Sequence, residues 1–270
     1  MEQWQRALVT GASSGIGEAL AGHLAAAGID VVLVGRDHAA LERVAAKARG
    51  SGVDAVVLAA DLAVDAEVAR VVSVLRDAEP MIDLLVNNAG LGQSGSFVDL
   101  PLAGALEVMR VNNDALVQLT HAAVLRMVAA GHGTIVQISS TVSAAPGPGQ
   151  AVYAASKAFV SSFGQALSAE LDGTGVMCTI VLPGHTRTRY FERMGFTADV
   201  PDKYWMTADD VARAAFDAAR RQLPIVIPGA INRRAIMMST SFPSLMKGRV
   251  VHKINEARHV AYRVKQRLLR

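Results

Sequence analysis

The alternation of short apolar runs with amphipathic stretches along the chain predicts an α/β protein. Seven short runs are apolar on both faces and rich in β-branched residues, which is typical of buried strands in a parallel sheet. They cover residues 6–10, 30–34, 53–59, 82–87, 134–139, 176–182 and 224–227. Helical periodicity covers residues 15–27, 39–49, 65–78, 102–130, 152–171 and 209–221. We therefore expect one domain: a doubly wound, mostly parallel seven-stranded sheet with helices on both faces.

Composition separates a body from a basic tail. The chain has 270 residues, of which 51% are hydrophobic, so it can bury a large core, and no linker divides residues 1–230. Residues 231–270 hold 10 of the 27 Lys and Arg residues and one acid, a net charge of +9, whereas residues 1–230 carry −6. We expect this tail to be a basic amphipathic helical extension, with its main helix over residues 249–269. Such a helix can contact an anionic membrane surface, a partner or another subunit; a solvated helix is the alternative.

Other composition features narrow the class of protein. Cys178 is the only cysteine, which excludes an intrachain disulfide and fits a reducing cytosol. The N-terminal apolar run is too short for a signal peptide, and no run of about 20 apolar residues occurs, so we expect a cytoplasmic protein that meets a membrane at most peripherally. The basic charge belongs to the tail and does not predict nucleic-acid binding. His252, Glu256 and His259 would share a face of the tail helix, but no further ligand completes a metal site, so we expect no metal.

A glycine-rich turn, Thr-Gly-Ala-Ser-Ser-Gly-Ile-Gly at residues 10–17, joins the first predicted strand to the first helix. Gly11, Gly15 and Gly17 permit a tight turn and close approach of the backbone to a phosphate, and the helix N-terminus attracts an anion. The turn therefore predicts a site for a dinucleotide pyrophosphate. Two other interpretations exist: a small-residue turn without a ligand, and the nucleophile elbow of a hydrolase. A hydrolase elbow normally follows an internal strand, whereas this turn follows the first strand.

The end of the second predicted strand bears on the choice of cofactor. In dinucleotide-binding folds an acid at this point binds the ribose 2′-hydroxyl, whereas an arginine accommodates a 2′-phosphate. Gly35 stands in the acid's place and Arg36 follows it, which favours NADP over NAD. Asp37 comes next and leaves NAD open, unless it caps the following helix.

Tyr153 and Lys157 are one helical turn apart, so both side chains lie on one face of the predicted helix. A cation near a phenol favours the phenolate and moves the pKa of the tyrosine toward neutrality, as proton transfer requires. Alone, such a pair is usually a solvated surface pair. Here Asn-Asn-Ala-Gly at residues 87–90, Ser140, and Pro183 with Gly184 end three neighbouring strands at the sheet edge where ligands bind. The sequence thus predicts one crevice with acid–base chemistry.

These motifs, in this order and spacing, resemble the short-chain dehydrogenase/reductase superfamily over residues 5–230. The motifs are TGxxxGIG at residues 10–17, NNAG at 87–90, Asn112, Ser140, Tyr153 with Lys157, and Pro183-Gly184. The resemblance implies a Rossmann fold and an NAD(P)-dependent oxidoreductase that interconverts a carbonyl and a secondary alcohol by hydride transfer. It implies that Tyr153 is the acid/base, and that Lys157 holds the nicotinamide ribose and lowers the pKa of Tyr153. Ser140 would bind the carbonyl oxygen, and Asn112 would anchor a water that relays protons to Lys157.

The resemblance also implies which residues hold the cofactor. The phosphates would lie against Gly11, Ser13, Ser14, Gly15, Ile16 and Gly17, the adenine against Asp61 and Leu62, the adenosine ribose against Asn88, and the nicotinamide end against Thr186 and Thr188. Asp61 has an alternative role as the cap of the turn that follows it. Ser14 stands where NADP-preferring members often carry a basic residue, so Arg36 would bind the 2′-phosphate with less help.

Large apolar side chains gather after Pro183-Gly184, in the region that in the resembled family closes over the substrate. They are Tyr190, Phe191, Met194, Phe196, Tyr204, Trp205 and Met206. We expect a bulky apolar substrate; a lid that packs only on itself is the alternative. The resemblance further implies a homo-oligomer, a dimer or tetramer. A non-catalytic dinucleotide-binding or sensory protein on the same fold is the rival function, and the intact Ser140, Tyr153 and Lys157 set argues against it.

Overall fold

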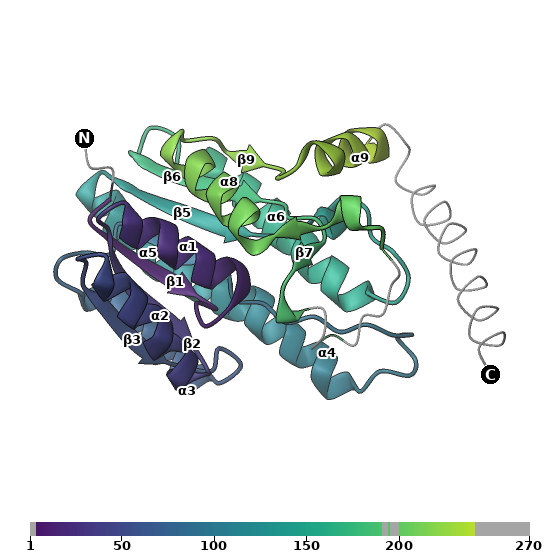
Figure 1. The fold of residues 1–270 in the computed structure, drawn as a ribbon, viewed down its shortest axis with the longest axis horizontal. Coiled ribbons are helices and arrows are strands. Elements are labelled where there is room, and N and C mark those ends of the chain that lie inside the picture. Colours follow the sequence, from purple (N-terminus) through teal and green to yellow (C-terminus); the bar gives the residue numbers. More distant parts are fainter. Residues whose placement is uncertain (1–3, 191–193, 195–199, 241–270) are drawn as a thin grey trace.

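The computed structural model describes residues 4–190, 194 and 200–240. Its centre is a seven-stranded sheet in which every pair of neighbours is parallel (Figure 1). The strands, in spatial order, are β3 (Ala55–Ala59), β2 (Asp30–Gly35), β1 (Arg6–Thr10), β4 (Leu84–Asn87), β5 (Gly133–Ile138), β6 (Val176–Val181) and β9 (Ile225–Val226). All seven predicted strands are confirmed, together with the doubly wound α/β architecture.

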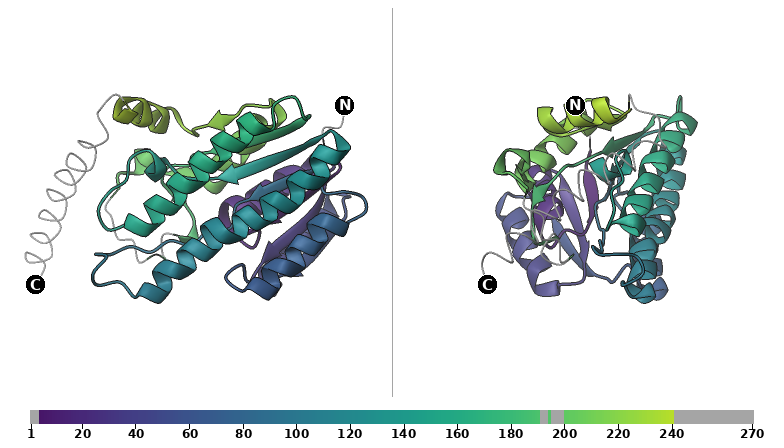
Figure 2. Two further views of the ribbon diagram at one scale, coloured as in Figure 1. Left: turned by 180° about the vertical axis from the view of Figure 1, so that it is seen from behind. Right: turned by 90° about the vertical axis from the view of Figure 1, so that its right-hand side faces the viewer.

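Helices cover both faces of the sheet (Figure 2). One face carries α1 (Gly15–Ala26), α2 (His38–Gly50) and α8 (Ala208–Arg220). The other face carries α3 (Asp65–Asp77), α4 (Leu102–Met109), α5 (Leu116–Ala130) and α6 (Ala151–Glu170). None of the helices in the described ranges is long and apolar enough to cross a membrane.

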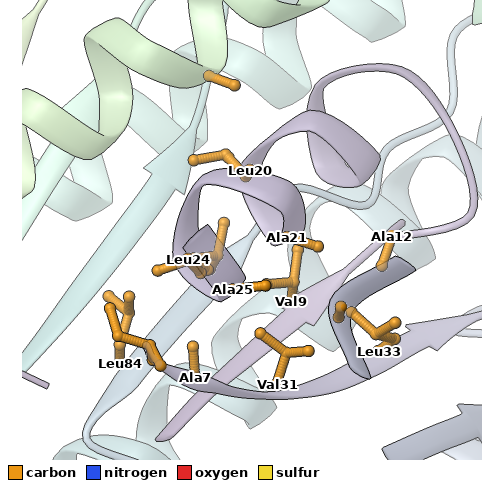
Figure 3. Packing of buried hydrophobic residues seen from close by; sticks show 14 of the residues in the cluster. Ala7, Val9, Ala12, Leu20, Ala21, Leu24, Ala25, Val31, Leu33 and Leu84 are labelled. Atoms are coloured by element: carbon orange, nitrogen blue, oxygen red, sulfur yellow. The ribbon is translucent and has the colours of Figure 1, made fainter. Parts of the chain in front are cut away.

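Strand β1 shows why the strand sequences are apolar without interruption. Ala7 and Val9 belong to the core under α1, whereas Leu8 belongs to the core on the opposite face. Figure 3 shows Leu20 and Leu24 of α1 above this first core. Because neighbouring residues of a strand point to opposite faces, a strand covered on both sides needs an apolar side chain at every position.

The strand order places the site of ligand binding. The chain runs outward from β1 to β3 and then returns to β4 on the other side of β1. In doubly wound sheets, the crevice at the carboxyl ends of the strands on either side of such a reversal is where ligands bind. Helical backbone covers all of the predicted residues 102–130, but its middle part, η1 (Arg110–Ala115), is π-helical and lies between α4 and α5. Asn112 belongs to this π-helical segment. Such π-segments frequently occur at functional sites.

A small second sheet and a further helix follow β6. The two-residue strands β7 (Thr186–Arg187) and β8 (Met206–Thr207) form a small parallel sheet, and α9 (Ala230–Thr240) follows β9. The sequence pattern does not predict β7 and β8, since two-residue strands leave no periodic signal. Helix α9 lies at the start of residues 231–270, for which a helical extension is expected. Asn232 of α9 donates a hydrogen bond from Nδ2 to the Pro228 carbonyl at 2.9 Å and lies 3.4 Å from Met206 Sδ. The boundary predicted after residue 230 therefore falls in the first turn of a helix that packs on the main domain. The predicted helix over residues 249–269 lies outside the described residues.

Candidate active site

The glycine-rich turn between β1 and α1 has the shape of an anion cradle. Gly11 and Gly15 have φ of +64° and +63°, a conformation that favours glycine. A Cβ on Gly11 would lie 2.9 Å from the Ala89 Cα, and one on Gly17 would overlap the Gly11 carbonyl. Ser14 is the N-cap residue of α1, and no side chain among the described residues makes a capping hydrogen bond there. Uncapped N–H groups at a helix N-terminus fit the phosphates of a dinucleotide.

The amide of Asn88 fixes the turn. Its Nδ2 donates to the carbonyls of Thr10 and Gly11 at 2.9 and 3.2 Å, and its backbone N–H donates to Thr10 Oγ1 at 3.0 Å. The ends of β1 and β4 are thereby joined below the turn. The predicted contact of Asn88 with the adenosine ribose stays a prediction.

Tyr153, Lys157 and Ser140 meet in the interior. Tyr153 and Lys157 lie on one face of α6 and are 8% and 5% exposed, so the pair is not a solvated surface pair. Ser140, just after β5, is 9% exposed, and its hydroxyl interacts with Tyr153, which lowers the pKa of the phenol. Ser139 points the other way, because its Oγ donates to the Lys157 carbonyl at 2.8 Å. The side chains of the two serines thus lie on opposite sides of the chain, as alternation along an extended backbone requires.

Burial dominates the electrostatics of this group. It raises the pKa of Tyr153, while hydrogen bonds from Tyr190 and Ser140 partly oppose the rise. Burial also lowers the pKa of Lys157 to about 8. The Lys157 ammonium donates to the Ile138 carbonyl at 2.8 Å, and a Cβ on Gly90 would lie 3.3 Å from its Nζ. That Lys157 lowers the pKa of Tyr153 stays a prediction.

Asn112 is fully buried, and its side chain joins the loop after β4 to α6. Its Oδ1 accepts the Leu91 N–H at 2.8 Å, and its Nδ2 donates to the Leu91 carbonyl and to Ser156 Oγ, both at 2.9 Å. These contacts satisfy the buried amide that the sequence placed in a long helix. The water relay predicted for Asn112 is not tested by them.

Arg36 lies at the end of β2 and is half exposed. Its Nη1 is 3.8 Å from Asp61 Oδ2 and 3.9 Å from Glu107 Oε1. Asp37 caps α2, because its Oδ1 accepts the Ala40 N–H at 3.0 Å. Asp37 is thus engaged with its own helix, and Arg36 is the charged group at the position that discriminates between the cofactors.

Of the other residues predicted to bind the cofactor, some lie near the surface and some in the core. Asp61 Oδ1 accepts the Ala63 N–H at 2.9 Å, so its side chain caps the turn after β3, and α3 begins only at Asp65. Leu62 is buried, Ile16 packs on the core under α1, and Ser13 lies against Gly35. No sequence motif marked Glu107, because a single acid on a helix surface leaves no pattern.

Thr186 and Thr188 occupy different positions in the segment after β6. Thr186 is buried, and its hydroxyl donates to the Gly184 carbonyl at 3.0 Å. Thr188 lies over the glycine-rich turn, where a Cβ on Gly15 would be 3.0 Å from Thr188 Cγ2. The structure thus brings Thr188, from a distant part of the sequence, to the predicted phosphate site.

The aromatic segment after Pro183-Gly184 divides into two parts. Tyr190 and Met194 reach the active site, where the Tyr190 ring lies 5.8 Å from the Tyr153 ring. Trp205 packs on His185, with ring centroids 5.5 Å apart, and Arg187 lies over it. Trp205 thus packs on residues of its own segment. Tyr204 faces Lys203, and Phe191 and Phe196 lie outside the described residues.

A small cavity of about 60 Å³ opens beside the first turn of α6. Its lining is mostly apolar: Gln93, Gly95, Phe97, Leu100, Gly149, Ala151 and Val152. Among the residues of known placement, no group of three or more His, Cys, Asp or Glu side chains could hold a metal ion. The His252, Glu256 and His259 set lies outside the described residues.

Comparison with known proteins gives one consistent result. The sequence profile of the short chain dehydrogenase family matches residues 5–197. A short chain dehydrogenase of Pseudocercospora fijiensis is 36% identical over 184 residues, which cover 67% of this chain and 60% of that protein. This chain therefore spans less than two thirds of that relative's length.

Two solved structures are similar over most of the chain. A short-chain dehydrogenase from Sphingobium yanoikuyae in complex with NADPH has a TM-score of 0.81 and 38% identity, and covers 90% of this chain and 95% of that one. A bulky-bulky ketone specific alcohol dehydrogenase from Comamonas testosteroni has a TM-score of 0.76 and 33% identity, and covers 88% and 93%.

Proposed function

Because the chain belongs to the short-chain dehydrogenase/reductase superfamily of oxidoreductases, we propose that it interconverts a ketone and a secondary alcohol, with NADP as the preferred cofactor and Tyr153 as the acid/base. The observation that carries this proposal is the buried group of Ser140, Tyr153 and Lys157 beside an uncapped, glycine-rich helix start. A module that only binds a dinucleotide would not need a buried phenol that interacts with a buried serine.

Each residue of the site has a role in this reaction. The cofactor, when bound, supplies or accepts the hydride. Ser140 and Tyr153 hydroxyls, which are already in contact, hold the oxygen of the carbonyl. Tyr153 donates its proton to that oxygen during reduction and accepts the alcohol proton during oxidation. Lys157 binds the nicotinamide ribose, and Asn112 anchors a water that passes protons to Lys157.

The preference for NADP rests on Arg36. Asp37 is used as a helix cap, so no acid of this loop competes for the ribose 2′-hydroxyl. The guanidinium of Arg36 is half exposed and lies loosely beside Asp61 and Glu107, at 3.8 and 3.9 Å. A 2′-phosphate can form shorter charge-assisted hydrogen bonds with this group than either carboxylate does. The bound NADPH in the Sphingobium yanoikuyae structure supports the same choice.

The substrate we propose is an apolar ketone or alcohol. Met194 is buried near the site, and the cavity beside α6 is lined by Phe97 and Leu100. The name of the Comamonas testosteroni structure, a bulky-bulky ketone specific alcohol dehydrogenase, supports a ketone with large substituents.

Assembly and location are part of the proposal. Exposed Leu125, Val128 and Phe159 on α5 and α6 support burial against a second subunit in a homodimer or tetramer. The cytoplasmic location rests on the single, buried Cys178. Contact of the basic tail with a membrane involves residues outside the described part and stays a prediction.

The test is turnover of NADPH with cyclohexanone, acetophenone and benzophenone, followed by the absorbance of the reduced cofactor. Tyr153→Phe should abolish turnover of every ketone that the unmodified protein reduces, while the affinity for NADPH, measured by calorimetry, changes little. Equal activity of the two proteins would overturn the assignment of Tyr153. Tight NADPH binding without reduction of any carbonyl would instead favour a non-catalytic dinucleotide-binding protein.

A further inference from the structure

Two phenols face each other in the active site. The rings of Tyr153, on α6, and Tyr190, on the segment after β7, have centroids 5.8 Å apart and are tilted by 48°. The two phenols interact electrostatically, and the interaction raises the pKa of Tyr190 while lowering that of Tyr153. The protonation states of the two phenols are therefore coupled.

The Tyr190 phenol is enclosed by the loop after β4. A Cβ on Gly92 would collide with both Tyr190 Oη and Met194 Sδ. Met194 is 6% exposed, and its N–H donates to the Tyr190 carbonyl at 3.0 Å. The Tyr190 N–H donates to Thr188 Oγ1 at 3.4 Å. Tyr190 and Met194 thus both pack against Gly92, and the Tyr190 ring lies against that of Tyr153.

The Tyr190 hydroxyl lies at a position that matters for the proposed reaction. In the proposed reaction the Tyr153 hydroxyl is shared between Ser140 and the substrate oxygen. In this structure the partners of the Tyr153 hydroxyl are the hydroxyls of Ser140 and Tyr190. A phenol hydroxyl has the donor and acceptor capacity of an alcohol, so it can make the hydrogen bond that the substrate makes.

We propose that the Tyr190 hydroxyl occupies, on Tyr153, the place of the substrate oxygen, and that a substrate binds only by displacing it. This inference rests on the proposed function. Tyr190 is then a specificity-determining residue, because its displacement costs a hydrogen bond and the contacts of a buried ring. A large apolar ketone can replace those contacts with Met194 and the Gly92 loop, whereas a small ketone cannot. The site should therefore discriminate against small ketones.

Tyr190 stays protonated, so its competition with the substrate for Tyr153 should not change with pH. Burial and the neighbouring Tyr153 hold the pKa of Tyr190 well above its ordinary value of 10.0. The hydroxyl remains neutral through the whole range in which a cytosolic enzyme works. Loss of the phenol, and not its titration, is thus the change that tests the inference.

The experiment measures binding without turnover. Cyclohexanone and acetophenone are titrated by calorimetry into the full-length protein saturated with NADP⁺, which cannot reduce a ketone. Tyr190→Phe keeps the ring and removes the competing hydroxyl, so both dissociation constants should fall about fivefold, the worth of one ordinary hydrogen bond. Tyr190→Leu, which also lacks the hydroxyl, should give the same direction and serves if the first variant folds poorly. Tyr204→Phe is the matched control, since Tyr204 faces Lys203, and should leave both constants unchanged.

The outcomes separate this inference from the proposed function. Unchanged constants in Tyr190→Phe, in a protein that reduces ketones with NADPH, would overturn the inference alone. Higher constants would also overturn it, because they would mean that Tyr190 helps to hold the substrate. If the unmodified protein neither reduces nor binds any ketone, the proposed function fails and this inference fails with it.

Discussion

The Lys157 ammonium donates a hydrogen bond to the Ile138 carbonyl at 2.8 Å, so the buried charge is tied to the last residue of β5. Among the described residues, that carbonyl is the only hydrogen-bond acceptor of the Lys157 ammonium. This is a poor substitute for water, and it explains why burial lowers the pKa of Lys157 from 10.5 to about 8.

The lowered pKa of Lys157 predicts how stability depends on pH. The charged lysine destabilises the folded, cofactor-free protein fully below about pH 8, and the penalty disappears as pH rises through the interval to 10.5, because the unfolded state then binds more protons. Lys157→Met removes the charge at every pH. Relative to the unmodified protein, its free energy of unfolding should be higher at neutral pH, and this advantage should shrink by about 2 kcal/mol at roughly pH 9.5. Urea unfolding at both pH values measures it; a constant difference would contradict it.

The hydrogen bond from Tyr190 predicts a second pH effect. It lowers the pKa of Tyr153 against the effect of burial, so Tyr190→Phe should raise that pKa. In the proposed mechanism, oxidation of an alcohol needs the deprotonated Tyr153, and its half-maximal rate should therefore move to higher pH. Reduction needs the protonated form and should persist to higher pH. The measurement is kcat for cyclohexanol with NADP⁺ across pH, with Tyr204→Phe as control; a profile that moves to lower pH would argue against the contact.

The position of Arg36 predicts cofactor selectivity. Arg36→Ala should raise the KM for NADPH roughly tenfold to a hundredfold, the worth of charge-assisted hydrogen bonds to a phosphate, and change that for NADH little. Glu107→Gln removes a carboxylate 3.9 Å from the guanidinium. Because the pair is exposed, the KM for NADPH should fall only about twofold. Steady-state kinetics with both cofactors test this, and an unchanged ratio in Arg36→Ala would refute the selectivity argument.

Much of the fold and of the site could be predicted from the sequence, for physical reasons. Strands covered on both faces must be apolar throughout, as Leu8 and its neighbours are, and this signal is local. The glycine-rich turn and the Tyr153–Lys157 pair also lie within short stretches of sequence. Their chemistry can therefore be recognised before the fold is known.

Other features arise only in three dimensions. The contact of Tyr190 with Tyr153 joins helix α6 to a segment whose sequence has no periodicity. The approach of Glu107 to Arg36 joins α4 to the end of β2, which are far apart in the sequence. Asn112, in the π-helical segment, makes hydrogen bonds with Leu91 and Ser156, which no spacing in the sequence encodes. Strands β7 and β8 have two residues each and leave no pattern.

Two glycines of helix α1 give a matched pair for the phosphate site. A Cβ on Gly17 would overlap the Gly11 carbonyl, which is backbone and cannot move without opening the glycine-rich turn. Gly17→Ala should therefore weaken NADPH binding at least tenfold and lower stability by about 1–3 kcal/mol, as is usual for overpacking. A Cβ on Gly22, in the same helix, would meet nothing within 4 Å, so Gly22→Ala should leave binding unchanged and raise stability by about 0.5–1 kcal/mol. Calorimetric titration with NADPH and thermal unfolding measure both effects. Normal NADPH affinity in Gly17→Ala would mean that the turn does not hold the cofactor phosphates.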